Sequence, residues 1–127
     1  MDSGDRPPVA IGHVSLRVAD VGRAAAFYVE LGLRPVFAND GMAILELRGG
    51  THLMLFKAKR APRTGSVGSF DFMVDEVEAL RARLTRAGVE TSAPARDELS
   101  GHVWFEASDP DGHRLRIYSD HTEGRAV

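Results

Sequence analysis

The stretch that decides the fold is residues 106–118, which read E-A-S-D-P-D-G-H-R-L-R-I-Y. Its centre, D-P-D-G at 109–112, has the residue types of a tight turn, because Pro presets φ and Gly tolerates a positive φ. After the turn, Leu115 and Ile117 alternate with charged or polar residues, as in a strand with one buried face. Residues 102–107 alternate in the same way before the turn. We therefore predict two strands joined at 109–112.

The first half of the chain predicts a β-α-β-β-β unit. Residues 11–18 alternate as a half-buried strand, and Asp20 then has the place of a helix N-cap. Gly32 suits the left-handed C-cap of the helix that follows Asp20. The later strand candidates are separated by turn signals, N-D-G at 39–41 and the pair Gly49-Gly50. These candidates are residues 35–37, 42–47 and 52–56.

The second half repeats this order of elements. Residues 69–74 predict a strand, and residues 77–87 carry an apolar stripe at helical spacing. Asp75 and Glu78 have the spacing of a capping box, so we expect the Asp75 side chain to cap this helix. Residues 89–93 predict an edge strand. A second β-α-β-β-β unit results, which the strands around the D-P-D-G turn complete.

The two units align residue by residue along their first and last strands. Ser69 lies 56 positions after His13, and Arg116 lies 62 positions after Met54. The difference between the offsets is explained by loop insertion. Neither unit covers its own sheet, so we expect the two to pack side by side or across a dimer. We predict an α+β fold in one domain, residues 1–127, with modules at about 9–57 and 68–120 and a linker at 58–67.

Composition excludes several classes of function. The 127 residues suit one domain, and the formal net charge of -2 gives no positive field for nucleic acid or anionic lipid, so neither partner is expected. With no Cys, a metal would need His, Asp or Glu, and disulfides and thiolate nucleophiles are excluded. The first ten residues, MDSGDRPPVA, lack the apolar core of a secretory signal, and no apolar run reaches the ~20 residues of a membrane span. We expect a cytoplasmic protein.

Three stretches carry a resemblance to a known family. They are G-H-V-S-L-R-V-A-D-V at 12–21, A-F-Y-V-E-L-G-L at 26–33, and the D-P-D-G stretch at 106–118. Together they resemble the glyoxalase, bleomycin resistance and extradiol dioxygenase superfamily, also called the vicinal oxygen chelate superfamily, over about residues 9–120. The resemblance implies two tandem β-α-β-β-β modules that form a curled mixed sheet, a cup with the helices outside. It also implies a homodimer.

Enzymes of this family bind one divalent metal ion in the cup, and the resemblance carries their four ligand positions onto His13, Met54, Ser69 and Arg116. Of these side chains only imidazole is an ordinary ligand for Zn, Ni, Mn or Fe. The guanidinium of Arg116 has no lone pair to donate, and its positive charge opposes a bound cation. We therefore expect no metal and no other cofactor. An anion is the ligand that Arg116 suits.

Period-two alternation predicts which other side chains share the cup face with these four positions. The opposing face is uniformly apolar, which supports the register; it carries Leu53, Leu55, Phe70, Phe72, Val103, Phe105, Leu115 and Ile117. On the cup face, aromatic side chains provide walls for a small molecule and polar side chains orient it. The predicted ligand-binding residues are His13, His52, Met54, Phe56, Ser69, Asp71, Trp104, Glu106, Arg116 and Tyr118.

Three functions stay open at this point. The first is a metal-free protein that sequesters a small, anionic or aromatic molecule, similar to the bleomycin resistance proteins. The second is a lyase, isomerase, dioxygenase or thiol transferase, with His13 and Glu106 as catalytic residues and a divalent metal held by a non-standard ligand set. The third is an interaction module whose cup is closed by an ion pair between Glu106 and Arg116. The loop at 93–101 is either a lid or a connector.

Overall fold

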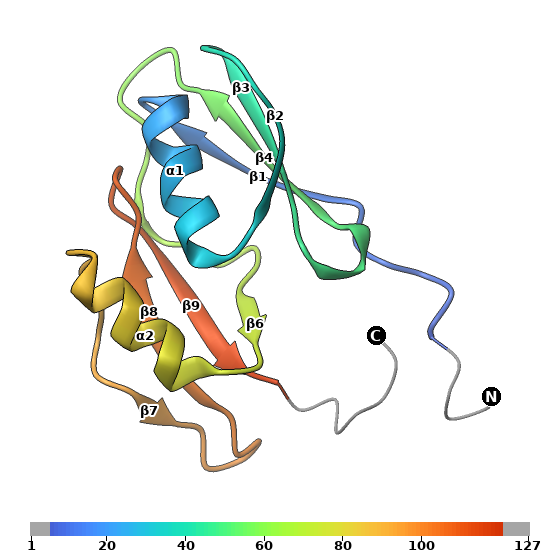
Figure 1. Ribbon diagram of the computed structural model, residues 1–127, viewed down its shortest axis with the longest axis vertical. Helices are drawn as coiled ribbons and strands as arrows, with labels where there is room; N and C mark the ends of the chain where they lie inside the picture. The colour runs from blue at the N-terminus through green and yellow to red at the C-terminus, as the bar shows by residue number, and fades with distance from the viewer. Residues whose placement is uncertain (1–5, 121–127) are drawn as a thin grey trace.

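The computed structural model describes residues 6–120. Figure 1 shows two β-sheets side by side, with one helix packed on the same side of each. The first module consists of β1 (His13–Val18), α1 (Val21–Leu31), β2 (Arg34–Ala38), β3 (Met42–Glu46), the short 3₁₀ turn η1 (Arg48–Gly50) and β4 (His52–Lys57). The second consists of β5 (Gly65–Ser66), β6 (Phe72–Val74), α2 (Val77–Arg86), β7 (Ala95–Arg96), β8 (Val103–Ser108) and β9 (His113–Ser119).

Both sheets are mixed and have the same strand order. The first runs β1-β4-β3-β2, and the second runs β5-β9-β8-β7 with β6 also paired to β9. Leu16 faces Leu55 in the parallel β1–β4 ladder, and Phe72 faces Ile117 in the parallel β6–β9 ladder. These pairs are related by the offsets of 56 and 62 residues found in the sequence. The predicted α+β fold of two repeated modules is confirmed.

The core lies between each sheet and its helix. Within the strands, buried residues alternate with half-buried or exposed ones, as the period of two requires. The strand residues that face the helices and are buried are Leu16, Val18, Ala43, Leu45, Leu53, Leu55, Phe72, Phe105, Ala107, Leu115 and Ile117. The other face of each sheet carries the predicted cup residues. In a single chain, most of that face is left in contact with solvent.

Local sequence signals define α1 as predicted. The Asp20 side chain accepts a hydrogen bond from the backbone N–H of Arg23 at 3.1 Å, which satisfies one of the free donors of the first turn. At the other end Gly32 has a φ of 130°, a conformation that favours glycine. Both caps are confirmed.

The predicted cap of α2 is wrong. The N-cap is Glu76, whose side chain makes no capping hydrogen bond, and the helix begins at Val77. The Asp75 carboxylate instead accepts a hydrogen bond from the Arg48 guanidinium at 3.0 Å. A charge-assisted contact with the other module therefore replaces the local capping interaction, a competition that spacing within the helix cannot reveal.

Two strand boundaries also differ from the sequence prediction. Strand β5 lies inside the predicted linker, because Gly65 and Ser66 pair with the start of β9. Strand β6 covers only the last three residues of the predicted strand at 69–74. The edge strand expected at 89–93 is reduced to one bridge, between Thr91 and Ala107, and the paired edge strand is β7. These segments are short, so pairing partners distant in the chain decide where they form.

The D-P-D-G turn does more than reverse the chain. Asp109, only 5% exposed, accepts hydrogen bonds from the backbone N–H groups of Asp111 and His113, both at 2.9 Å. Its other carboxylate oxygen accepts a 2.6 Å hydrogen bond from the Tyr28 hydroxyl on α1. Burial, followed by the nearby Asp109, raises the pKa of Tyr28 and keeps the hydroxyl protonated.

Two further hydrogen bonds join this turn to the end of β1. The Asp111 carboxylate accepts from the backbone N–H of Ala19 at 2.9 Å, and His113 Nε2 lies 2.8 Å from the backbone oxygen of Arg17. We call the set formed by Tyr28, Asp109, Asp111 and His113 the latch. It is the hydrogen-bonded connection between the two modules at this end of the junction. Within residues 6–120, no helix is long and apolar enough to cross a membrane.

Candidate functional site

The uncovered face of the second sheet carries an aromatic and cationic cluster on β8 and β9. Trp104 and Tyr118 face each other across the two strands, with ring centroids 5.9 Å apart. The Arg116 guanidinium carbon lies 4.5 Å from the centroid of the Trp104 ring, within range of a cation–π interaction. Arg116 also donates a hydrogen bond to the Tyr118 hydroxyl at 3.3 Å. The three side chains thus form one flat polar and aromatic surface.

The charge of Arg116 is fully maintained in this environment. Its hydrogen bond to Tyr118 is the largest effect that raises the pKa of the guanidinium, and the carboxylates of Glu106 and Asp71 also contribute. The side chain is exposed. A permanent charge with free N–H donors, held above an indole ring, can bind a carboxylate or another oxyanion.

His102 supports the same cluster from the start of β8. Its ring meets Tyr118 edge to face, with centroids 5.6 Å apart, and its Nδ1 lies 2.7 Å from the backbone oxygen of Ser119. The preceding loop is organised by Asp97, whose carboxylate accepts hydrogen bonds from the Ser100 hydroxyl and the Leu99 backbone N–H. These bonds hold the pKa of Asp97 below its usual value. The loop lies at the β7 edge of the sheet, beside the cluster.

The uncovered face of the first sheet has a related but less polar surface. His13 and His52 face each other across β1 and β4, with ring centroids 6.0 Å apart. Two strand pairs further along, the Arg17 guanidinium carbon lies 5.4 Å from the Phe56 ring centroid. Met54 lies between them and faces Ile44 of β3. A second cation–π pair therefore stands where the repeat predicts a counterpart of the Tyr118 region.

The β3 side chains on this face were not predicted. Met42 faces Phe56, and Ile44 faces Met54, so both belong to the same surface. Their positions match Trp104 and Glu106 once the offset of 62 residues is applied. The alternation in residues 42–47, taken together with the repeat, was the signal that could have found them.

Comparisons with known proteins agree with this architecture. The family model described as Glyoxalase/Bleomycin resistance protein/Dioxygenase superfamily matches residues 10–117. The chain belongs to this superfamily. No curated protein sequence matches it.

Solved structures of the superfamily align over nearly the whole chain. A lactoylglutathione lyase from Agrobacterium tumefaciens is 25% identical, with a TM-score of 0.70, and the match covers 90% of this chain and 96% of the lyase. A superfamily member from Sphaerobacter thermophilus DSM 20745 is 23% identical, with a TM-score of 0.75 and coverage of 88% and 98%. Oxidase ChaP-H2 is 21% identical, with a TM-score of 0.71 and coverage of 91% and 96%. The last two likenesses show the fold.

The metal positions of the superfamily do not fit a metal ion in this chain. Met54 offers a soft thioether, Ser69 a neutral hydroxyl, and Arg116 no lone pair. Arg116 is moreover occupied with Trp104 and Tyr118. Within residues 6–120 no group of three His, Asp or Glu side chains is close enough to hold a metal ion. The non-standard set considered above, which combines Glu106 with His13 and a second histidine, is therefore not assembled within one chain.

The predicted site residues fall into two groups, one on each sheet. Trp104, Glu106, Arg116 and Tyr118 lie together on β8 and β9, whereas His13, His52, Met54 and Phe56 lie together on β1 and β4. Ser69 and Asp71 precede β6 and are exposed. No described interaction joins the uncovered faces of the two sheets.

The expected ion pair between Glu106 and Arg116 is not formed. The two residues are cross-strand partners in β8 and β9. However, none of the ion pairs within 4.0 Å in residues 6–120 joins them. The guanidinium is drawn to the Trp104 ring and the Tyr118 hydroxyl instead. The cluster is therefore open to a ligand and is not closed by its own charges.

Proposed function

We propose that this protein binds a planar, anionic small molecule on the Trp104–Arg116–Tyr118 cluster and sequesters it without chemical change. The observation that supports this proposal is the Arg116 guanidinium lying 4.5 Å from the Trp104 ring and forming no ion pair with Glu106. A planar ligand stacks on the aromatic rings while its carboxylate accepts hydrogen bonds from Arg116. Both contacts come from two paired strands, so they are held in fixed relation.

Binding without a metal is the part of this proposal that side-chain chemistry supports. The superfamily's metal positions carry Met54, Ser69 and Arg116, which fit a metal poorly. His13, the one suitable side chain, lies on the other sheet with His52 as its neighbour. The enzymatic alternative is a metal-dependent lyase, the activity named for the A. tumefaciens relative. It would require a divalent ion such as Zn, Ni, Mn or Fe, with His13 and Glu106 brought to one site.

We also propose that the binding form is a homodimer. The uncovered faces of the two sheets carry several half-buried apolar side chains, among them Met42, Met54, Phe56 and Trp104. A second copy that covers these faces would bury them and complete the walls of the cup. Light scattering after gel filtration measures the mass directly. A mass of one chain at micromolar concentration contradicts the homodimer. We propose that the protein works in the cytoplasm.

The ligand-binding proposal is tested through Trp104, the only tryptophan of the chain. We expect 4-nitrobenzoate, a planar anion that quenches indole, to quench the Trp104 fluorescence in a saturable manner. Arg116→Gln should weaken this binding at least tenfold. Arg114→Gln is the matched control, because Arg114 lies on the same face two residues away and is bonded to Ser66.

Metal analysis separates the two functions. The sequestration proposal expects no stoichiometric transition metal in protein purified without chelators, and quenching that EDTA leaves unchanged. About one metal per chain, lost in His13→Ala, would contradict it and support the lyase. Quenching that is unsaturable, or equal in Arg116→Gln and wild type, would also contradict it.

A further inference from the structure

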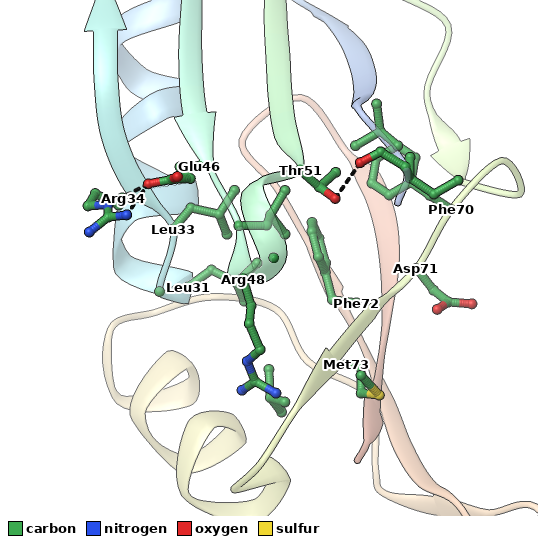
Figure 2. A pocket seen from close by; sticks show the side chains of 16 residues that line it. Leu31, Leu33, Arg34, Glu46, Arg48, Thr51, Phe70, Asp71, Phe72 and Met73 are labelled. Atoms are coloured by element: carbon green, nitrogen blue, oxygen red, sulfur yellow. Dashed lines mark hydrogen bonds and ion pairs between the residues drawn. The ribbon is translucent and has the colours of Figure 1, made fainter. Parts of the chain in front are cut away.

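A second hollow lies between the two modules, on the side of the sheets that faces the helices. Figure 2 shows it from close by, with Leu31 and Leu33 on one wall and Phe70 and Phe72 on the other. Its volume is about 670 Å³. Val14, a β1 residue of the helix-facing set, also lines it. We call this hollow the intermodule cavity. It is separate from the Trp104 cluster, because none of the lining residues belongs to β8 or β9.

The repeat of the modules explains why a cavity forms here. The junction between the modules has two ends that the repeat relates to each other. At one end the latch brings the turn at 109–113 against the end of β1. At the other end the corresponding turn, at 47–51, faces the end of β6 and lines the cavity.

The second turn lacks the groups that form a latch. Applying the offset of 62 residues, Leu47 stands in place of Asp109, and Gly49 stands in place of Asp111. Leu84 likewise stands in place of Tyr28 when the offset of 56 is applied. No carboxylate or hydroxyl can therefore close this end. A Cβ atom added at Gly49 would meet no atom within 4 Å, so the space beside this turn is open.

The charged groups at the mouth of the cavity are already paired. Arg34 forms an ion pair with Glu46, and Arg48 forms one with Asp75 at 3.0 Å. Arg48 also lies 3.7 Å from Asp120. Figure 2 shows Asp71 on the opposite side of β6 from Phe72, so its carboxylate points away from the apolar walls.

The one hydroxyl among the labelled lining residues is also engaged. Thr51 Oγ1 donates a 2.6 Å hydrogen bond to the backbone oxygen of Ile11. A charged ligand would have to break an existing ion pair to find a partner in the cavity, whereas a neutral ligand breaks none. The paired mouth and the apolar walls thus favour a ligand without charge.

We propose that the intermodule cavity is a second binding site, for a neutral and largely apolar small molecule. Ligand pockets of proteins fall at about 300–1,000 Å³, are lined mainly by apolar and aromatic side chains, and occur preferentially between domains. The intermodule cavity meets all three conditions. An occupant touches α1 and β1 of one module and β6 of the other, so it stabilises the junction at the end that has no latch.

This proposal does not depend on the function proposed for the Trp104 cluster, because the two sites differ in ligand charge and in position. Toluene and benzoate are a suitable pair of probes, since both have one benzene ring and only benzoate is charged. We expect toluene to shift the methyl NMR signals of Val14, Leu31 and Leu33 in a saturable manner and to leave Trp104 unaffected. We expect benzoate to leave these methyl signals unchanged, whatever it does at Trp104.

Two filling variants test the location of the toluene site. Val14→Phe and Leu47→Phe each enlarge a different wall, so one serves if the other fails to fold. Either should weaken toluene binding at least tenfold. Val29→Phe is the matched control, because Val29 is an exposed residue of α1 outside the cavity, and it should bind toluene as the wild type does.

Three results would overturn the proposal. One is the absence of saturable toluene shifts in the cavity methyl groups. Another is equal toluene binding in the wild type and both filling variants. The third is a dimer in which intermolecular NOEs place a second copy in the cavity. Loss of 4-nitrobenzoate quenching with intact toluene binding would instead refute only the function proposed for the Trp104 cluster.

Discussion

Removal of one buried hydroxyl should uncouple the two modules at the latch. Tyr28→Phe deletes the donor of the 2.6 Å hydrogen bond to Asp109 and leaves the ring, which is fully buried, in place. The Asp109 carboxylate then keeps its two backbone donors but loses its only described contact with α1. Hydrogen bonds to charged groups contribute about 1.5–3 kcal/mol, and Asp109 is too buried for water to replace the lost donor fully. We expect the free energy of unfolding to fall by about 1.5–3 kcal/mol.

The assay is urea unfolding, followed by far-UV circular dichroism at fixed protein concentration. Tyr118→Phe is the matched control, since that hydroxyl accepts a longer bond, 3.3 Å, from the exposed Arg116. It should change the free energy of unfolding by less than about 0.5 kcal/mol. A double-mutant cycle with Asp109→Asn should give a coupling energy within the range expected of close partners, about 0.5–3 kcal/mol. Equal stability of Tyr28→Phe and wild type would refute the proposed role of the latch.

The same variant makes a prediction about alkaline pH. The pKa of Tyr28 is raised in the folded state, so above the ordinary tyrosine pKa of 10.0 the unfolded chain loses this proton while the folded chain keeps it. The folded state then binds more protons, and stability falls as pH rises, by up to about 1.4 kcal/mol per pH unit from this group. Tyr28→Phe lacks this loss. The stability gap between wild type and variant should therefore narrow between pH 10 and 11, and a constant gap would contradict the argument.

The remaining predictions concern local structure, and all are read by urea unfolding. Asp20→Ala should destabilise the protein by about 1 kcal/mol, because it removes the cap of α1, whereas Glu76→Ala should have almost no effect since Glu76 makes no capping bond. A loss at Glu76 equal to that at Asp20 would show that these caps do not act as described. Gly112→Ala should cost about 1–3 kcal/mol, because Gly112 has a φ of 93°. Gly12→Ala, at a residue without positive φ and with open space at its Cβ, is the control.

Local sequence signals predicted the elements that depend on near neighbours. Alternation identified the buried faces of β4, β8 and β9, and the Asp20 and Gly32 caps fixed both ends of α1. The offsets of the repeat matched the pairing registers of both modules. Each of these signals acts over a few residues, or is written twice in the chain, so the sequence displays it directly.

Contacts between distant residues could not be predicted in the same way. Asp75 was expected to cap α2, but Arg48, 27 residues away, binds it. Glu106 and Arg116 were expected to pair, but Trp104 holds the guanidinium. In both cases the residue types allowed several partners. The three-dimensional neighbourhood chose among them.

The amino-acid sequence by itself determined the α+β class, the two modules, the core faces and the set of residue types available on the cup face. These follow from backbone geometry and from the period of hydrophobic residues. Only the tertiary structure decided how the modules meet. Tyr28 and Asp109 are 81 residues apart, and their hydrogen bond closes one end of the junction. At the related end, Leu47 and Gly49 offer no such bond, and the intermodule cavity remains between apolar walls. A hydrogen bond needs its two groups within about 3 Å of each other, and only the folded chain brings them together.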